Sequence, residues 1–197
     1  MIILAWHFCT ADRRLGYDDG REIVVGQTLS VKGHLELCKC GLHGSIRARD
    51  ALRYAPGPII CRTRHGGDIL RGDNKLCSSE RTVIAMADAT DELCAFARWC
   101  ALSVLHLWDA PDIVRRYLET GDESIRAAAE AAAWDATGVA ARVATWDAIW
   151  AVAGGAARAA ARVATRVAAW DAARDAAEEA QNTELERRLH TLLGTTP

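Results

Sequence analysis

The last third of this 197-residue chain contains almost no proline and no cysteine: only Pro197 follows Pro111, and no cysteine follows Cys100. Proline interrupts helices, so its absence leaves this part able to form long ones. No run of about 18 apolar residues occurs, and the N-terminus lacks the basic start and long apolar stretch of a signal peptide. The seven cysteines are odd in number and irregularly spaced, which indicates reduced thiols. We therefore expect a cytoplasmic protein without a membrane segment.

An excess of positive charge is also missing. The chain has 24 basic and 26 acidic residues, a net charge of −2. Nucleic acids attract proteins through their phosphates, and a chain without a positive field gains little from them. Nucleic-acid binding is therefore not supported.

The composition changes near residue 120, which predicts two domains. Both methionines, both phenylalanines and all three tyrosines lie before residue 120, whereas alanine, charged residues and tryptophan dominate after residue 125. Such different compositions bury surface in different ways. We expect a first domain over residues 1–120 and a helical module over residues 122–192.

Short apolar, β-branched segments separated by turn residues predict strands in the first domain. They lie at residues 2–8, 22–31 (two strands), 35–38, 58–63 and 81–86. Three- and four-residue spacing of apolar residues predicts helices at 46–54, 90–108 and 113–118, the last ending at Gly121. The sequence predicts the α+β class: a small N-terminal domain with a mixed or antiparallel sheet and short helices, followed by an Ala-rich helical hairpin or long helix.

A four-residue repeat begins at Arg126. Fourteen tetrads follow without an insertion, and the third position is alanine in all but one of them, where it is Val152. Alanine has the highest helix propensity, so the segment should be helical. Two adjacent glycines, Gly154 and Gly155, lie near its middle and disfavour helix there. We expect either a hairpin with helices over about 122–153 and 156–190, or one continuous helix.

The repeat positions four tryptophans that supply most of its large apolar area, namely Trp134, Trp146, Trp150 and Trp170. One interpretation is that they form the core between the two helices and the first domain. The other is that they form an interface for a second copy of the chain, since an Ala-rich hairpin alone buries little apolar area. The tryptophans are our predicted interface residues in a homo-oligomer.

The densest group of potential ligands is Cys38-Lys39-Cys40-Gly41-Leu42-His43. Its two thiols and imidazole are weak zinc candidates, with Cys9 or His7 completing four ligands, but the second half of a zinc motif is missing. We therefore predict no metal. A nucleophilic Cys38 or Cys40 activated by His43 is a further alternative. Buried thiols beside a structural histidine are the simplest interpretation.

Four short motifs resemble a family of uncharacterised phage and bacterial proteins, many of which carry an Ala/Trp-rich tetrapeptide tail. These motifs are Trp6-His7-Phe8, Cys38-x-x-Gly41-Leu42-His43-x-Ser45, Ala51-Leu52-Arg53-Tyr54-Ala55-Pro56-Gly57-Pro58 and Asp73-Asn74-Lys75. The resemblance covers nearly the whole chain. It implies a phage-related protein with this domain and tail, and no particular activity.

The order of motifs is also similar to the ADP-ribosyltransferase fold. That resemblance implies NAD as the cofactor, with His7 as the histidine that contacts the nicotinamide-side ribose. Residues 41–45 would correspond to the second motif, in which His43 replaces the usual tyrosine. Glu80 would be the catalytic glutamate, placed by its order in the chain.

Two functions follow from the sequence. The leading hypothesis is a non-enzymatic assembly or interaction protein without a cofactor, whose helical module binds a second copy or another partner. The alternative is an NAD-dependent ADP-ribosyltransferase-like enzyme that uses His7, His43 and Glu80.

Overall fold

The computed structural model describes residues 2–16, 19–133 and 169–196. They form an α+β structure, which confirms the predicted fold class. The chain divides into two compact units, one of Met1–Thr90 with Asn182–Pro197 and one of Asp91–Gln181. The predicted boundary near residues 120–122 was drawn from composition and falls inside the second unit. That division into domains stays a prediction.

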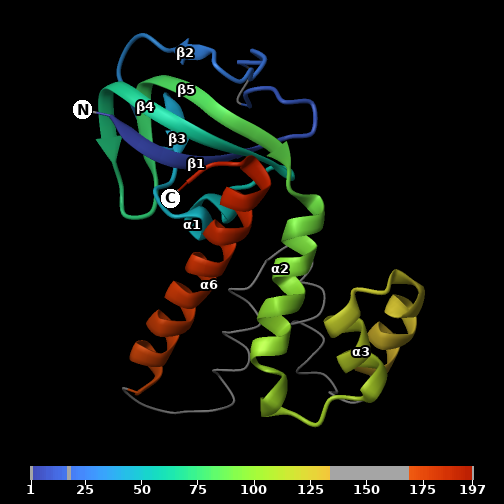
Figure 1. Ribbon diagram of the computed structural model, residues 1–197. Coiled ribbons are helices and arrows are strands. Elements are labelled where there is room, and N and C mark those ends of the chain that lie inside the picture. The colour runs from blue at the N-terminus through green and yellow to red at the C-terminus, as the bar shows by residue number, and fades with distance from the viewer. Residues whose placement is uncertain (1, 17–18, 134–168, 197) are drawn as a thin grey trace. The chain divides into compact units, whose positions relative to one another are not determined.

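The first unit is built on an antiparallel sheet (Figure 1). Its strands are β1 (Ile3–Cys9), β2 (Thr28–Ser30), β3 (Leu42–Gly44), β4 (Ile59–Arg71) and β5 (Leu76–Asp88). The order is β1-β4-β5-β2, and β3 pairs with β5 beyond the end of β2. Strand β1 confirms the predicted strand at residues 2–8.

Ser45 links β3 back to the first strand. Its backbone N–H donates to the Trp6 carbonyl (2.9 Å), and its own carbonyl accepts from the Trp6 N–H (2.7 Å). Since β3 also pairs with β5, the path β1-β4-β5-β3 returns to β1 and the small sheet closes on itself. Side chains on its inner face are thereby shielded from water.

The hairpin of β4 and β5 is longer than the sequence predicts. Gly66 and Gly67 look like loop residues, yet they lie inside β4, where the register shifts between Gly66 and Ile69. A bulge accommodates them, and Gly67 has a φ of +66° that suits glycine. Both strands therefore run on to a turn in which the Gly72 N–H donates to the Lys75 carbonyl (2.8 Å).

Two predicted strand regions differ from the structure. Residues 35–38 form no strand, because the chain turns tightly there: the Cys40 N–H donates to the Glu36 carbonyl, and Cys38 has a φ of +68°. Within residues 22–31 only β2 is a named strand, and Val25 adds an isolated bridge to Val83. Residues 22–31 thus run along β5 in short contacts instead of a full ladder.

Helix α6 (Ala169–Leu193) ends against the first unit, where its last turns cover one face of the sheet. Leu185 and Leu189 are fully buried, and the His190 ring packs edge-on against Trp6 with centroids 4.8 Å apart. Ala5 and His7 are the neighbours of Trp6 in β1, so their side chains point to the face opposite Trp6. We call residues 182–193 the C-terminal anchor.

The anchor also caps a short helix, α1 (Ala48–Leu52), which has no capping side chain of its own. Glu186 accepts a hydrogen bond from the Ala48 N–H (3.0 Å), and Asn182 accepts one from the Arg49 N–H (3.1 Å). Both amides belong to the first turn, which has no partner within the helix. Residues more than 130 positions apart thus complete one helix terminus.

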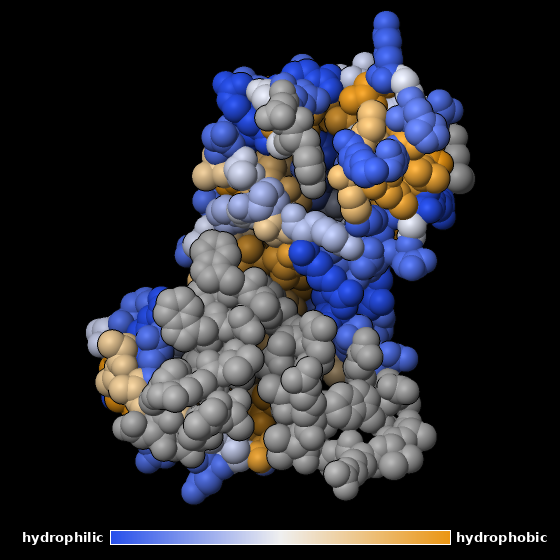
Figure 2. Space-filling view, turned by 180° about the vertical axis from the view of Figure 1, so that it is seen from behind, coloured by the Kyte–Doolittle hydropathy of each residue, from blue (hydrophilic) through white to orange (hydrophobic). Residues whose placement is uncertain are grey.

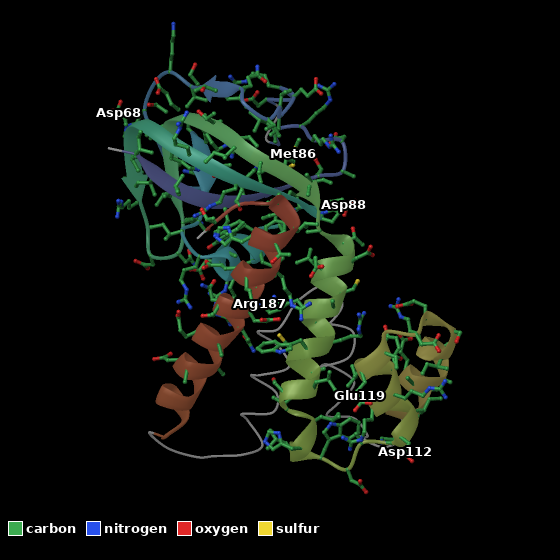
Figure 3. All side chains as sticks on the ribbon, viewed as in Figure 1. Asp68, Met86, Asp88, Asp112, Glu119 and Arg187 are labelled. Carbon is green, nitrogen blue, oxygen red and sulfur yellow. The ribbon has the colours of Figure 1, made fainter. Side chains whose placement is uncertain are left out.

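The second unit contains α2 (Thr90–Ser103), η1 (Leu105–Leu107), α3 (Asp112–Thr120) and η2 (Glu123–Ile125), and residues 126–133 are also helical. The Asp88 carboxylate, labelled at the end of β5 in Figure 3, accepts a hydrogen bond from the Thr90 N–H (2.8 Å) where α2 begins. Gly121 ends α3 with a φ of +67°, as predicted. In the part of the chain that the structure describes, no helix has the length and apolar content to cross a membrane.

The repeat is described only at its ends. Residues 126–133 and α6 are helical, as the tetrads predict. The expected bend at Gly154-Gly155 lies outside the described residues, as do Trp134, Trp146 and Trp150. Trp170 lies within α6, but its side chain is outside the description.

Candidate functional site

Polar side chains lie buried on the inner face of the sheet, opposite Trp6. Thr63, His65 and Ser78 are fully buried. The Thr63 hydroxyl donates to the Ala5 carbonyl (3.0 Å) and lies 3.1 Å from His65 Nε2. His65 Nδ1 lies 2.7 Å from the Ser78 hydroxyl. The imidazole is therefore held between two hydroxyls inside the closed sheet.

Proton counting fixes the tautomer of this ring. Thr63 uses its only proton on Ala5, so it accepts from His65 Nε2–H, and Nδ1 is left as an acceptor. The Ser78 hydroxyl lies 2.7 Å from both Nδ1 and the Glu80 carbonyl and donates to one of them at a time. Burial first, and then the charge of Arg81, lowers the pKa of His65 to about 3. The ring is thus neutral at pH 7.

Gly44 leaves the space that His65 occupies. A Cβ atom at Gly44 would lie 2.7 Å from His65 Nε2 and 3.2 Å from the Ala5 Cβ. Any side chain there would displace the imidazole. The glycine and serine of the Leu42-His43-Gly44-Ser45 motif therefore have structural roles, one making room for His65 and the other closing the sheet at Trp6.

Arg81 is the most unusual residue of the first unit, because its charged side chain is only 1% exposed. Its Nη1 donates to the His43 carbonyl (2.7 Å). Its Nε and Nη2 have no hydrogen-bond partner among the residues that the structure describes. Burial lowers the pKa of Arg81 to about 10, so the guanidinium remains charged at pH 7. Two unused donors on a buried cation are suited to hold an anionic group.

The charge of Arg81 acts on two of the predicted catalytic residues, His7 and His43. Burial lowers the pKa of His7 well below its usual value, and the charge of Arg81 lowers it further, followed by His65 and His43. The pKa of His43 is likewise lowered by burial and then by Arg81. Arg81 thus lowers the pKa of His7, His65 and His43, and each of the three is favoured in its neutral form.

Glu80, the third predicted catalytic residue, lies on the outer face. It is exposed, and a Cβ at Gly66 would lie 3.5 Å from its carboxylate. Neighbouring residues of a strand point to opposite faces, so Arg81 takes the inner position and Glu80 the outer one. His7 and His43 both feel the charge of Arg81, the His43 ring contacts the turn at Cys38, and Glu80 lies on the outer face.

Two buried thiols complete the surroundings of Arg81. Cys9 on β1 and Cys61 on β4 lie on the same face and hydrogen-bond to each other. The Cys61 hydrogen bond, opposed by burial and helped by Arg81, lowers the pKa of Cys9. The hydrogen bond to Cys9, together with burial, raises the pKa of Cys61. Of the two thiols, Cys9 is the one whose pKa is lowered, and the charge of Arg81 contributes to that lowering.

The weak zinc candidates have other partners. His43 Nε2 accepts a hydrogen bond from the Cys38 N–H (2.9 Å), and the ring also hydrogen-bonds to the Gly41 backbone. The Cys38 thiol accepts a hydrogen bond from Lys75. Within the described ranges no three histidine, cysteine or acidic side chains are grouped so as to hold a metal ion.

Sequence reasoning missed Arg81, His65, Thr63 and Ser78. Charged and hydroxyl residues in a strand are normally read as the solvent side, and here they face inward. The sequence signal for this burial is weak, because polar residues are consecutive over 62–65 and 78–82 and do not distinguish one face of the hairpin from the other. Only the closing of the sheet at Ser45 makes their face an interior.

No family model matches the chain, and neither do the curated proteins or the solved structures with which it was compared. The candidate site is therefore defined by the geometry of its residues alone.

Proposed function

We propose that this chain is an interaction protein whose tetrapeptide-repeat segment binds a second copy of the chain, while the α+β unit holds the end of that segment. The observation that carries the proposal is the continuity of α6. This one helix contains the last three tetrads, residues 170–181, and then the anchor that is buried in the first unit. The last three tetrads thus continue into the anchor within one helix, with no linker between them.

The part of α6 before the anchor offers surface for contact. None of residues 175–180 is buried, and half of them are alanine. Small side chains let helix axes approach closely, so two such surfaces can pack together. In contrast, the surface of the first unit mixes apolar and polar side chains, as Figure 2 shows by colour. Leu4 and Ile84 are among the exposed apolar residues of this unit.

The repeat tryptophans supply the apolar area that alanine lacks. An Ala-rich helix buries little surface per residue, and each tryptophan adds a large area when it is covered by a partner. Interfaces between identical chains use the same surface on both copies. We therefore assign the predicted interface residues Trp134, Trp146, Trp150 and Trp170 to contacts between two chains.

Substitution of these tryptophans tests the proposal. A variant with all four replaced by alanine should lose self-association, measured by light scattering of gel-filtration fractions over a range of loading concentrations. The control is Trp108→Ala, because Trp108 is partly buried outside the repeat. The control should associate as the unmodified chain does. Unchanged association of the fourfold variant, with its helix content retained, would overturn the proposal.

The enzyme alternative is supported by one observation, a buried arginine that has two unused donors and whose charge lowers the pKa of both His7 and His43. A phosphate of NAD has the charge that such donors require. In this alternative the chain consumes NAD, and His7→Ala abolishes that consumption. Chromatography can measure the release of nicotinamide from NAD by the unmodified chain and by His7→Ala. This measurement distinguishes the two functions. No release by the unmodified chain excludes the enzyme.

A further inference from the structure

The tight turn at residues 36–40 displays an exposed thiol. Cys38 and Cys40 are both exposed, and Cys38 has the left-handed φ of +68°. Its backbone N–H is held by His43 Nε2 at 2.9 Å, and the Cys40 N–H donates to the Glu36 carbonyl at 2.9 Å. This backbone conformation is unfavourable for a residue other than glycine, and here two hydrogen bonds stabilise it. The turn therefore holds the Cys38 side chain in a defined position.

Lys75 places a positive charge on that thiol. Its ammonium group donates a hydrogen bond to Cys38 Sγ and lies 4.4 Å from the centre of the Tyr54 ring. The Tyr54 hydroxyl in turn donates to Asn74 Oδ1 (2.9 Å). The hydrogen bond with Cys38 is the main cause that raises the pKa of Lys75, so the lysine stays charged at pH 7. Cys38 and Tyr54 thus both contact the Lys75 ammonium group.

Two further cysteines, Cys40 and Cys77, belong to the same region of the first unit. Cys77 lies buried on β5 opposite His43, and a Cβ at Gly41 would lie 3.2 Å from its sulfur. Burial raises the pKa of Cys77, and the nearby Cys40 and Cys38 raise it further. Of these three cysteines, Cys38 is the one that combines exposure with a bound cation.

These contacts revise the sequence alternative in which His43 activates a cysteine. The His43 Nε2 atom is occupied by the Cys38 backbone N–H, so the ring has no contact with the thiol there. The group on the sulfur is Lys75, which the sequence motif does not include. An exposed thiol next to a lysine ammonium is the setting in which cysteines react as thiolates.

We propose that Cys38 is a modification site that forms a mixed disulfide with a low-molecular-weight disulfide such as oxidised glutathione. The Cys38 thiol gives its proton to solvent, and the thiolate attacks one sulfur of the reagent. The reagent's S–S bond breaks as the Cys38–S bond forms. The electron pair leaves on the second glutathione, which takes up a proton and is the reduced product, while Cys38 is oxidised. The ammonium of Lys75 stabilises the attacking thiolate. This site is independent of the repeat and of the function proposed above.

The test compares thiols within one chain. The full chain is exposed to oxidised glutathione at pH 7 for a series of times, and peptide mass spectrometry follows the adduct at each cysteine. Cys94 is the internal control, because it is exposed on α2. Cys38 should react about twofold faster than Cys94: one nearby unit charge in water favours the anionic sulfur about fivefold, and the lower nucleophilicity of a stabilised sulfur offsets about half of that free energy. Equal rates, or faster reaction at Cys40 or Cys94, would overturn the proposal.

Two substitutions test the role of the cation. Lys75→Met should reduce the Cys38 rate to that of Cys94, and Lys75→Arg should keep most of the advantage. The Cys94 rate should not change in either variant, and thermal unfolding of each variant reports whether the fold is intact. A Cys38 rate that is the same in all three chains contradicts the assignment to Lys75.

Discussion

Replacement of Leu189 by alanine should destabilise the first unit, although this residue lies 100 positions beyond the sheet. Leu189 lies in the last turns of α6, and its side chain is fully buried in the first unit. Truncation of a buried leucine removes apolar burial and leaves a cavity, which together cost about 2–5 kcal/mol. Leu192, on the same helix, is 36% exposed, and its replacement should cost less than about 1 kcal/mol.

Hydrogen exchange followed by mass spectrometry measures the effect where it arises. In Leu189→Ala, peptides from β1 and β4 should exchange faster by the factor that corresponds to the lost free energy, and in Leu192→Ala they should be nearly unchanged. Urea unfolding followed by circular dichroism gives the total change. Equal effects of the two substitutions on β1 and β4 would refute the docking of the anchor against the sheet.

Three further predictions concern the interior and the cap of α1. Because burial depresses the pKa of His65 to about 3, its contribution is complete above the unfolded value of about 6.5 and declines as the pH falls; at pH 5 the loss is about 2 kcal/mol. Urea unfolding at pH 7 and pH 5 checks this, and equal stabilities would contradict it. Gly44→Ala should cost about 1–3 kcal/mol by thermal unfolding because its Cβ would meet His65, whereas Gly16→Ala, with no atom within 4 Å, should cost much less. Glu186→Ala should cost about 1–3 kcal/mol through the lost acceptor for the Ala48 N–H, and Glu186→Gln should retain most of the stability; similar losses would exclude the cap.

The sequence predicts those elements whose signals are local. Strand β1, helix α1 and the start of α2 follow from apolar spacing and turn residues, and Gly121 marks the end of α3. The length of the β4–β5 hairpin could not be predicted, because Gly66 and Gly67 signal a loop locally while pairing with β5 keeps them in the strand. Tertiary pairing overrides local propensity there.

The candidate site was only partly predictable for the same reason. His7 and His43 stand out as histidines in short motifs, and the structure places both near Arg81. Arg81 itself gives no signal, since an arginine in a strand is normally at the surface. Lys75 reaches Cys38 only because the β4–β5 turn returns the chain to the turn at residues 36–40. Contacts of this kind depend on the closed sheet and not on spacing along the chain.

The central claim is that the repeat joins one copy of this chain to another. Sedimentation equilibrium of the unmodified chain over a wide concentration range measures this directly. We expect a mass above that of the 21.4 kDa monomer that falls towards it on dilution. A mass of one chain at every concentration would contradict the claim.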